Sequence, residues 1–95
     1  MKILLSKHAQ EKLNERRIEI QHIEQVLNNV EYHFYDLFSK AFISIAKIRI
    51  EGINTNMIVV HKSEKDQIKI VTVYPCRDLE KEIKRKEGSK WIRIK

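Results

Sequence analysis

The stretch AFISIAKIRI, residues 41–50, decides the fold class of this 95-residue chain. A β-strand turns successive side chains to opposite faces, so alternate positions describe each face. The even positions are apolar apart from one serine, and the odd positions begin with an alanine and two isoleucines. The odd face then ends in Lys47 and Arg49. We therefore predict a strand in which two cations interrupt an otherwise apolar run.

Three further segments predict partners for this strand. Residues 32–37, 56–61 and 67–74 alternate in the same way, and short polar stretches, including residues 51–55, separate them. Short polar connections between successive strands favour an antiparallel meander. We expect Pro75 to end the last of these strands, because proline has no backbone N–H to donate.

Apolar residues at helical spacing predict three helices. Ser6 caps the first, which runs to about residue 17, and the second covers about residues 19–28. Asp78 caps the third, over about residues 79–86, and Gly88 ends it. In this last helix glutamates come first and basic residues last, the order that complements a helix dipole.

Two short segments leave alternatives open. Lys2–Leu5 is consistent with a short strand or with a lead into the first helix. Residues 91–94 are consistent with a last short strand or with a segment that docks onto a partner. We predict one α+β domain over residues 1–95: two N-terminal helices packed on a four-stranded antiparallel sheet, then a C-terminal helix and a basic tail.

Composition narrows the chemistry. One cysteine, Cys76, excludes an internal disulfide and a cysteine-based metal cluster, and two glycines are too few for a glycine-rich phosphate loop. None of the four histidines lies at metal-ligand spacing from another on one helix, so we expect neither a metal nor a cofactor. The chain shows no spanning segment and no signal peptide, which predicts a cytoplasmic protein without membrane contact.

Positive charge is concentrated in the last third of the chain. Residues 67–95 carry nine basic and four acidic groups, so +5 of the total charge of +6 lies there. A basic surface of this kind attracts a polyanion, although a solvated helix face is the ordinary alternative. The candidate nucleic-acid-binding residues are Lys12, Arg77, Lys84, Arg85, Lys86, Trp91 and Arg93.

Metal-free cleavage of RNA by its own 2′-hydroxyl needs a base, cations that stabilise the phosphorane, and an acid. Lys47 and Arg49 suit the second role, although one wet sheet face would also explain them. A helical stripe of His8, Lys12 and Arg16 offers further groups, and ordinary helix ion pairs are its simpler explanation. The candidate catalytic residues are His8, Arg16, Lys47, Arg49, His61 and Tyr74.

Two motifs resemble a known family. The stretch SKHAQEKLNERRI, residues 6–18, and the stretch IVTVYP, residues 70–75, look like the first helix and last strand of small uncharacterised prokaryotic proteins. That family is distantly similar to the RelE/ParE and BrnT-like toxins, small basic α+β proteins that often cleave RNA and pair with an antitoxin. His8, Lys12, Arg16 and Tyr74 match the nearer family's pattern, with Lys12 standing where arginine is common.

The resemblance implies a RelE-like fold, RNA as substrate and an antitoxin protein as partner. Our first hypothesis is a toxin-like, metal-free endoribonuclease. The alternatives are a non-catalytic nucleic-acid-binding module that uses residues 81–95, and a protein-interaction domain whose edge strands or tail pair with another chain. In the last case the other chain could be a second copy, as a homo-oligomer.

Overall fold

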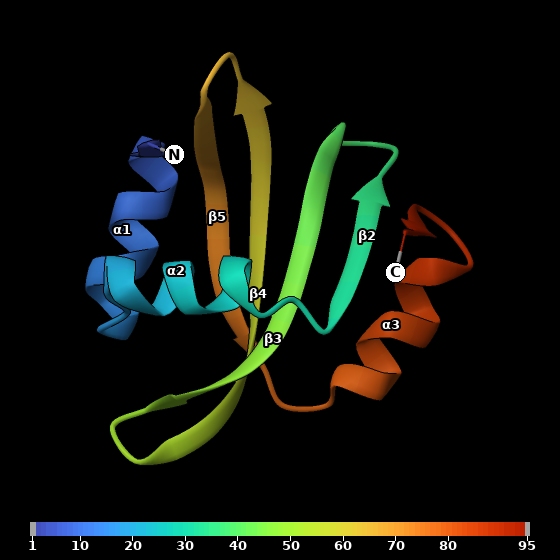
Figure 1. The fold of residues 1–95 in the computed structure, drawn as a ribbon. Helices are drawn as coiled ribbons and strands as arrows, with labels where there is room; N and C mark the ends of the chain where they lie inside the picture. The colour runs from blue at the N-terminus through green and yellow to red at the C-terminus, as the bar shows by residue number, and fades with distance from the viewer. Residues whose placement is uncertain (1, 95) are drawn as a thin grey trace.

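Nine elements follow one another in residues 2–94, the part of the chain that the computed structural model describes. They are β1 (Lys2–Leu5), α1 (Lys7–Arg16), α2 (Ile20–Asn28), β2 (Tyr32–Asp36), β3 (Ala41–Ile50), β4 (Ile53–Glu64), β5 (Gln67–Cys76), α3 (Leu79–Glu87) and β6 (Trp91–Arg93). The six strands form one twisted sheet in the order β1-β5-β4-β3-β2-β6. Helices α1 and α2 lie on one side of it and α3 on the other (Figure 1).

This sheet corrects the prediction of a four-stranded, wholly antiparallel sheet. The overall α+β class is confirmed, but the sheet has six strands and is mixed: β1 runs parallel to β5, with Ile3 opposite Ile68. At the other edge β6 runs antiparallel to β2, with Ile92 opposite Tyr35. Strands of four and three residues are too short for alternation to identify, and their partners are distant in the chain.

Strands β4 and β5 extend beyond their predicted bounds. The turn between β3 and β4 is only Glu51-Gly52, both at positive φ, so pairing resumes at once between Ile50 and Ile53. Pro75 lies inside β5 rather than ending it. Strand β1 pairs with β5 only as far as Ile70, so the outer edge of β5 is free at Pro75. The N–H that proline lacks therefore costs no hydrogen bond between strands.

Local side-chain contacts start the helices where the sequence predicts them. The Ser6 hydroxyl accepts the Ala9 N–H at 3.0 Å, and the Asp78 carboxylate accepts the Lys81 N–H at 3.1 Å. Helix α2 begins differently, with the Nδ1 atom of His22 accepting the Glu19 N–H at 2.9 Å. None of the helices in residues 2–94 is long and apolar enough to cross a membrane.

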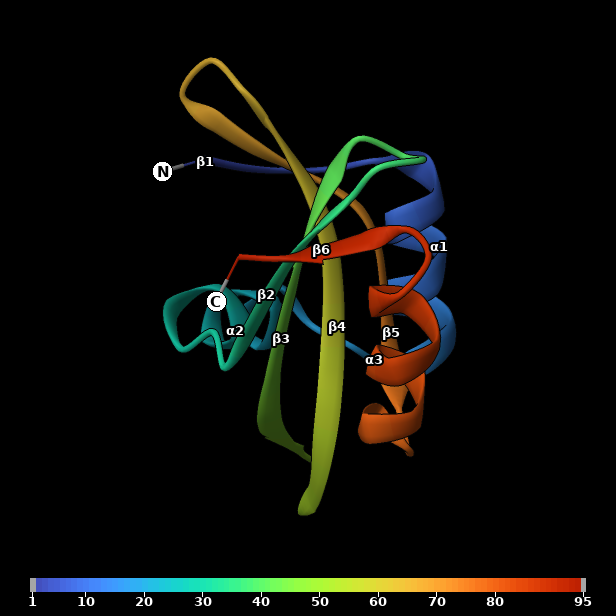
Figure 2. The same cartoon turned by 90° about the vertical axis from the view of Figure 1, so that its right-hand side faces the viewer.

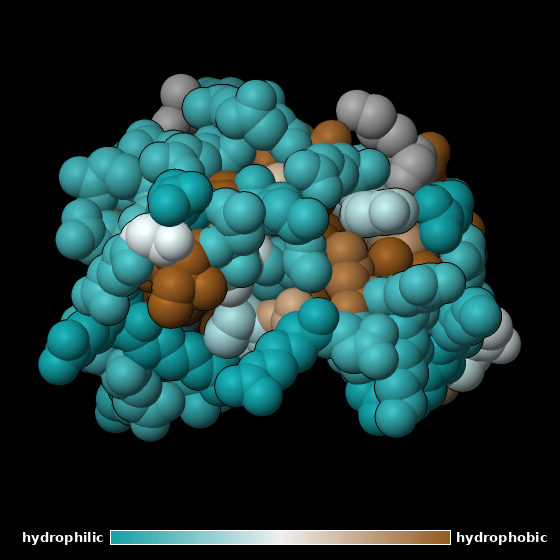
Figure 3. Space-filling model, turned by 90° about the horizontal axis from the view of Figure 1, so that it is seen from below, coloured by the Kyte–Doolittle hydropathy of each residue, from teal (hydrophilic) through white to brown (hydrophobic). Residues whose placement is uncertain are grey.

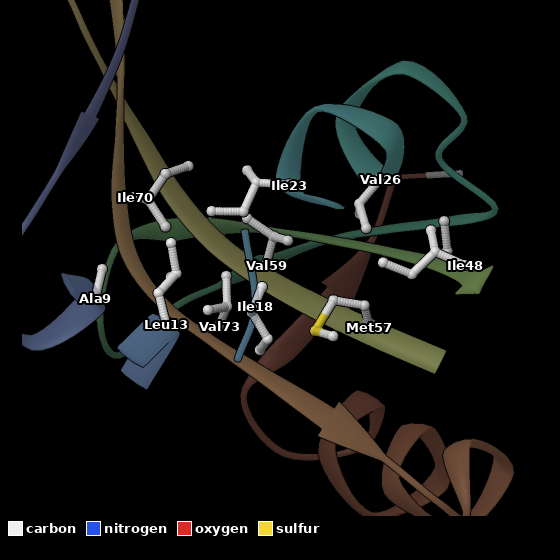
Figure 4. Packing of buried hydrophobic residues seen from close by; sticks show 11 residues of the cluster. Ala9, Leu13, Ile18, Ile23, Val26, Ile48, Met57, Val59, Ile70 and Val73 are labelled. Atoms are coloured by element: carbon white, nitrogen blue, oxygen red, sulfur yellow. The ribbon is translucent and has the colours of Figure 1, made fainter. Parts of the chain in front are cut away.

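The sheet is buried on both faces, in two separate cores. We call the first face the α1–α2 face. Its core joins residues of both helices to β3, β4 and β5, and Figure 4 shows these side chains pointing toward one another across the sheet: Ala9, Leu13, Ile18, Ile23, Val26, Ile48, Met57, Val59, Ile70 and Val73. Burial of several branched side chains at 0% exposure supplies most of the local stability.

We call the second face the α3 face. Its core holds residues of β2, β3 and β4 beneath two side chains from the end of the chain, Ile83 and Trp91. The Trp91 ring lies 5.1 Å from that of Phe34. Its indole Nε1 donates to the buried carboxylate of Asp36 at 3.3 Å, which ties the C-terminal segment to β2.

Asp36 is the polar centre of this core. Its carboxylate also accepts the backbone N–H groups of Phe38, at 2.9 Å, and Ser39, at 3.1 Å. Burial opposes ionisation of this carboxyl, but the hydrogen bonds from Ser39 and Phe38 and the charge of Lys90 outweigh it. The pKa of Asp36 therefore lies below its ordinary value of 3.8.

We predict that Asp36→Asn lowers the free energy of unfolding by about 2 kcal/mol at pH 7, since an amide cannot accept all of these donors. Because the pKa of Asp36 is lowered in the folded state, its contribution is present above pH 4 and declines at lower pH. The mutant and wild-type stabilities should therefore converge on acidification. Urea unfolding at several pH values measures this, with the exposed Asp66→Asn as the control. Equal stability of Asp36→Asn and the wild type at pH 7 would contradict it.

Candidate nucleic-acid interface

Lys47 and Arg49 lie on the α3 face, at the end of β3 beyond the cover of the C-terminal helix. Both are exposed, and the preceding residues of that face, Ile43 and Ile45, are buried. Lys47 stands opposite Asn56 of β4, which in turn stands opposite Cys76 of β5. The sheet register thus forms a short row of three side chains that leads to the start of α3.

A groove of about 720 Å³ opens between this row and α3. We call it the α3 groove. It is lined by Glu31, Tyr32, Lys47, Asn56, Arg77, Asp78, Leu79, Glu80, Ile83, Lys84, Glu87 and Arg93. In the view from below (Figure 3), the mostly hydrophilic surface is interrupted by apolar atoms beside α3 and by a second apolar patch at the β3–β4 hairpin. The structure therefore brings predicted residues from β3, α3 and β6 to one groove.

The charges of the groove divide into committed and uncommitted groups. Arg93 is committed to Glu87, donating through Nε at 2.8 Å and Nη2 at 3.2 Å, and Asp78 is committed to capping α3. Within residues 2–94 no ion pair holds the three remaining cations, Lys47, Arg77 and Lys84, or the two remaining carboxylates, Glu31 and Glu80. The whole lining contains four basic groups and four carboxylates, so the formal charge of the groove is zero. Arg49, farther along the same strand face, adds one positive charge.

Arg93 contacts two aromatic rings as well as a carboxylate. Its guanidinium lies 5.7 Å from the centre of the Tyr32 ring and 5.1 Å from that of Phe34. The hydrogen bonds from Arg93 lower the pKa of Glu87, and the same bonds raise the pKa of Arg93. Arg93 and Tyr32 therefore form one wall of the groove together, and the guanidinium of Arg93 is already paired with the carboxylate of Glu87.

Arg85 and Lys86, also predicted to bind nucleic acid, are engaged by Glu82. Arg85 forms an ion pair with this carboxylate, and the Lys86 ammonium lies 3.5 Å from it. Lys86 also lies 5.4 Å from the centre of the Trp91 ring. Trp91 is only 2% exposed, so this ring has no free face for a nucleotide base and serves as a core residue.

Tyr74 lies half-buried on the α3 face, opposite Ile58, and packs against the core rather than lining the groove. Burial, followed by the negative charges of Glu82 and Cys76, raises the pKa of Tyr74 to about 12. Its hydroxyl is therefore protonated at neutral pH. Tyr74 shares a sheet face with Lys47 and Arg49, but of these three residues only Lys47 lines the groove.

The helical stripe of His8, Lys12 and Arg16 lies elsewhere. His8 is exposed on α1, and Lys12 forms an ion pair with Glu15 at 3.2 Å. Arg16 donates to the backbone carbonyl of Val73 at 3.1 Å, on the outer side of β5. Arg16 also lines a small hollow with core residues of the α1–α2 face, so the structure does not bring this stripe to Lys47 and Arg49.

His61 lies on the α1–α2 face, across the sheet from the groove. Its Nε2 is 2.7 Å from the hydroxyl of Ser44, and its ring stacks with those of Phe42, at 6.0 Å, and His33, at 6.4 Å. Burial, followed by the charge of His33, lowers the pKa of His61 to about 4. His61 is thus neutral at pH 7 and hydrogen-bonded to a serine that is 2% exposed, an arrangement suited to packing.

The sequence prediction of the site missed most of the lining, including the four polar residues used below, Glu31, Tyr32, Asn56 and Glu80. Asn56 faces Lys47 because the two-residue turn Glu51-Gly52 sets the register of β3 and β4. The Glu51-Gly52 turn could have predicted that Asn56 lies beside Lys47. Assigning all of residues 51–55 to the loop hides this register. No sequence pattern marks Glu31 or Glu80, because tertiary packing alone brings them together.

The fold and the groove define a small α+β protein with a mixed sheet buried on both faces and an open, charged groove beside its last helix. The chain belongs to the family described as Domain of unknown function (DUF4258), whose model matches residues 5–75. This match runs from the last residue of β1 through most of β5 and leaves out α3 and β6. No curated protein and no solved structure matches the chain.

We predict that acidification destabilises the protein through His61. Since the pKa of His61 is lowered from 6.5 to about 4 on folding, the unfolded state binds the proton more readily between these values. Stability should be complete above about pH 6.5 and fall by about 1–2 kcal/mol toward pH 4, allowing for the partial exposure of the ring. In His61→Gln, which retains a hydrogen-bonding side chain, this part of the loss should disappear.

Chemical denaturation as a function of pH, together with an NMR titration of the imidazole, measures both quantities. His8→Gln is the matched control, since His8 is exposed on α1. A His61 ring that titrates near pH 6.5 in the folded protein would contradict the prediction.

Proposed function

We propose that this protein binds single-stranded RNA in the α3 groove. The observation that carries the proposal is the gathering of Lys47, Arg77 and Lys84 around one groove without an ion-pair partner within residues 2–94. Three separate elements contribute these cations: a central strand, the connection after β5, and the C-terminal helix. Cations left unpaired on a groove wall favour the phosphates of a polyanion.

The remaining features of the groove suit RNA. Tyr32 offers an aromatic ring at the wall, and Asn56 offers amide donors and acceptors beside Lys47. Stacking and edge hydrogen bonds of this kind recognise unpaired bases. The resemblance of residues 6–18 and 70–75 to relatives of the RelE/ParE and BrnT-like toxins also supports RNA as the polyanion.

We expect the triple variant Lys47→Gln, Arg77→Gln, Lys84→Gln to bind a labelled RNA of about 20 nucleotides at least about tenfold more weakly at 0.1 M salt. The slope of log affinity against log salt should fall by about 2, since each lost phosphate contact removes about 0.7 for a single strand. Fluorescence anisotropy over a salt series measures both quantities.

The matched control is Lys7→Gln, which removes an exposed cation from α1 outside the groove. Its affinity and salt slope should remain close to those of the wild type. Equal loss of binding in the control and the triple variant would show that general charge rather than the groove holds RNA.

A second candidate function, metal-free cleavage of the bound RNA, rests on a specific observation. The carboxylates of Glu31 and Glu80 share the groove with the unpaired cations. A carboxylate can accept the 2′-hydroxyl proton, the cations can stabilise the phosphorane, and the Tyr32 hydroxyl can protonate the leaving oxygen. This set retains Lys47 from the original candidates and replaces the five that lie outside the groove: His8, Arg16, Arg49, His61 and Tyr74.

We expect wild-type protein in chelator to cleave RNA to products that end in a 2′,3′-cyclic phosphate. Glu31→Gln combined with Glu80→Gln should reduce the rate at least about 100-fold while leaving RNA affinity unchanged or slightly higher. Gel analysis of end-labelled RNA measures the rate. RNA with 2′-deoxy positions should resist cleavage. Intact RNA at every protein concentration would refute this function and leave the binding proposal standing.

A further inference from the structure

Exposed apolar side chains gather at one edge of the sheet. Six large apolar side chains are exposed in residues 2–94, and four of them come from two neighbouring segments: Leu37 (47%), Phe38 (78%), Ile92 (51%) and Ile94 (49%). A backbone hydrogen bond of 2.8 Å, from the Leu37 N–H to the Lys90 carbonyl, holds the two segments side by side. We call these four residues the β6 patch.

No helix covers the sheet at this place. Helix α1 packs against β5 and β1, and α2 packs against β3 and β4, so the α1–α2 side of β2 and β6 is left open. Ile92 faces this open side, because its neighbour Arg93 stacks on Phe34 of the opposite face. Opposite Ile92 lies Tyr35, whose ring packs edge-on against Phe42 at 5.2 Å. The patch therefore continues into a half-buried aromatic surface.

The backbone of β6 is also open on its outer side. The Lys90 carbonyl and the Ile94 N–H bond to β2, so the alternate residues Trp91 and Arg93 turn their backbone groups away from it. The described part of the chain places no strand beyond β6, which lies nearest the viewer in Figure 2 with nothing in front of it. An open edge next to exposed apolar side chains is a template for another strand.

The charge around this edge selects among possible occupants. Residues 36–40 and 87–94 contain three cations, Lys40, Lys90 and Arg93, and two carboxylates, Asp36 and Glu87. Asp36 lies 3.9 Å from Lys90 and Glu87 pairs with Arg93, so a surplus of one positive charge remains, at Lys40. A second copy of this chain, with its charge of +6, would bring the same sign to the same place. Phe38 is the one ring of the β6 patch, and its other three side chains, Leu37, Ile92 and Ile94, are aliphatic and offer a nucleotide base nothing to stack on. An acidic polypeptide complements both properties.

We propose that an extended, acidic segment of another protein adds to β6 as a seventh strand. Residues opposite one another on neighbouring strands share a face, so its apolar side chains would lie beside Ile92 and Ile94. Its acidic side chains would alternate toward the side of Arg93. Main-chain hydrogen bonds to Trp91 and Arg93 supply affinity, and the alternation supplies specificity. This site is separate from the RNA-binding proposal, because the β6 patch and the uncommitted cations of the α3 groove share no residue.

The test uses the full chain as bait for a phage-displayed library of random peptides of about 12 residues. We expect enriched peptides to be net acidic, with apolar residues at alternate positions. A synthetic copy should shift the backbone amide resonances of Trp91 and Arg93. Its affinity should fall at least about tenfold for Ile92→Glu and for Phe38→Glu, two exposed positions whose substitution leaves the core intact.

The matched control is Ile53→Glu, which changes an isoleucine that is 67% exposed, at the distant β3–β4 turn, and should leave affinity unchanged. Enriched peptides that are basic, or that bind Ile92→Glu as tightly as the wild type, would overturn the proposal. So would the absence of any enriched peptide. A dimer in sedimentation that Ile92→Glu abolishes would assign the edge to a second copy, and RNA binding lost in Ile92→Glu would assign it to nucleic acid.

Discussion

The carboxylate of Asp36 holds the second half of this structure together. It accepts two backbone N–H groups of the turn after β2 and the indole N–H of Trp91, and Lys90 lies 3.9 Å from it. One buried group thereby fixes the β2–β3 turn and the end of the chain at the same place. A buried carboxylate is costly unless its lone pairs are used, and here the neighbouring donors use them.

The position of α3 follows from this anchor. The chain leaves β5 at Cys76, crosses the sheet face as α3, and returns as β6 beside β2. With Trp91 held by Asp36 and Ile83 buried at 8% exposure, α3 cannot move over the face to cover Lys47. The two cations at the end of β3 are thus left in water at the side of the helix. The α3 groove exists because the C-terminal segment is fixed at its far end.

The sequence predicted the elements whose signals are local. The Ser6 and Asp78 caps mark the starts of two helices, and strict alternation predicted the strand Ala41–Ile50 with its observed bounds. The prediction of a four-stranded sheet was wrong for a physical reason: β1 and β6 are strands only because distant strands pair with them. The register of β3 and β4 could not be predicted either, because the turn was assigned to residues 51–55. In the structure Glu51-Gly52 alone reverses the chain. Residues that stand side by side on neighbouring strands at the groove, such as Lys47 and Asn56, therefore could not be paired beforehand.

Counts of charged residues along the sequence predicted the candidate site only coarsely, because they do not show which cations form ion pairs. The last third of the chain carries the surplus, yet Glu82 engages Arg85 and Lys86, and Glu87 engages Arg93. In the α3 groove, the cations that remain unpaired are Lys84, Arg77 and, from the middle of the chain, Lys47. An ion-pair partner one helical turn away is visible in sequence, whereas the Arg93–Glu87 pair depends on the reversal after α3. The surface proposed to bind RNA is therefore defined by the cations that the fold leaves unpaired.

Arg93 shows how alternation along a strand keeps the two proposed surfaces apart. Its side chain points to the α3 face, where it walls the groove with Tyr32, and its backbone lies on the open edge of the sheet. Ile92, one residue earlier, points to the opposite face. A strand added at this edge would use the backbone of Arg93 and the side chain of Ile92, whereas the uncommitted cations of the groove lie on β3, on α3 and in the connection before it. A three-residue strand can thus border two surfaces that separate substitutions can test.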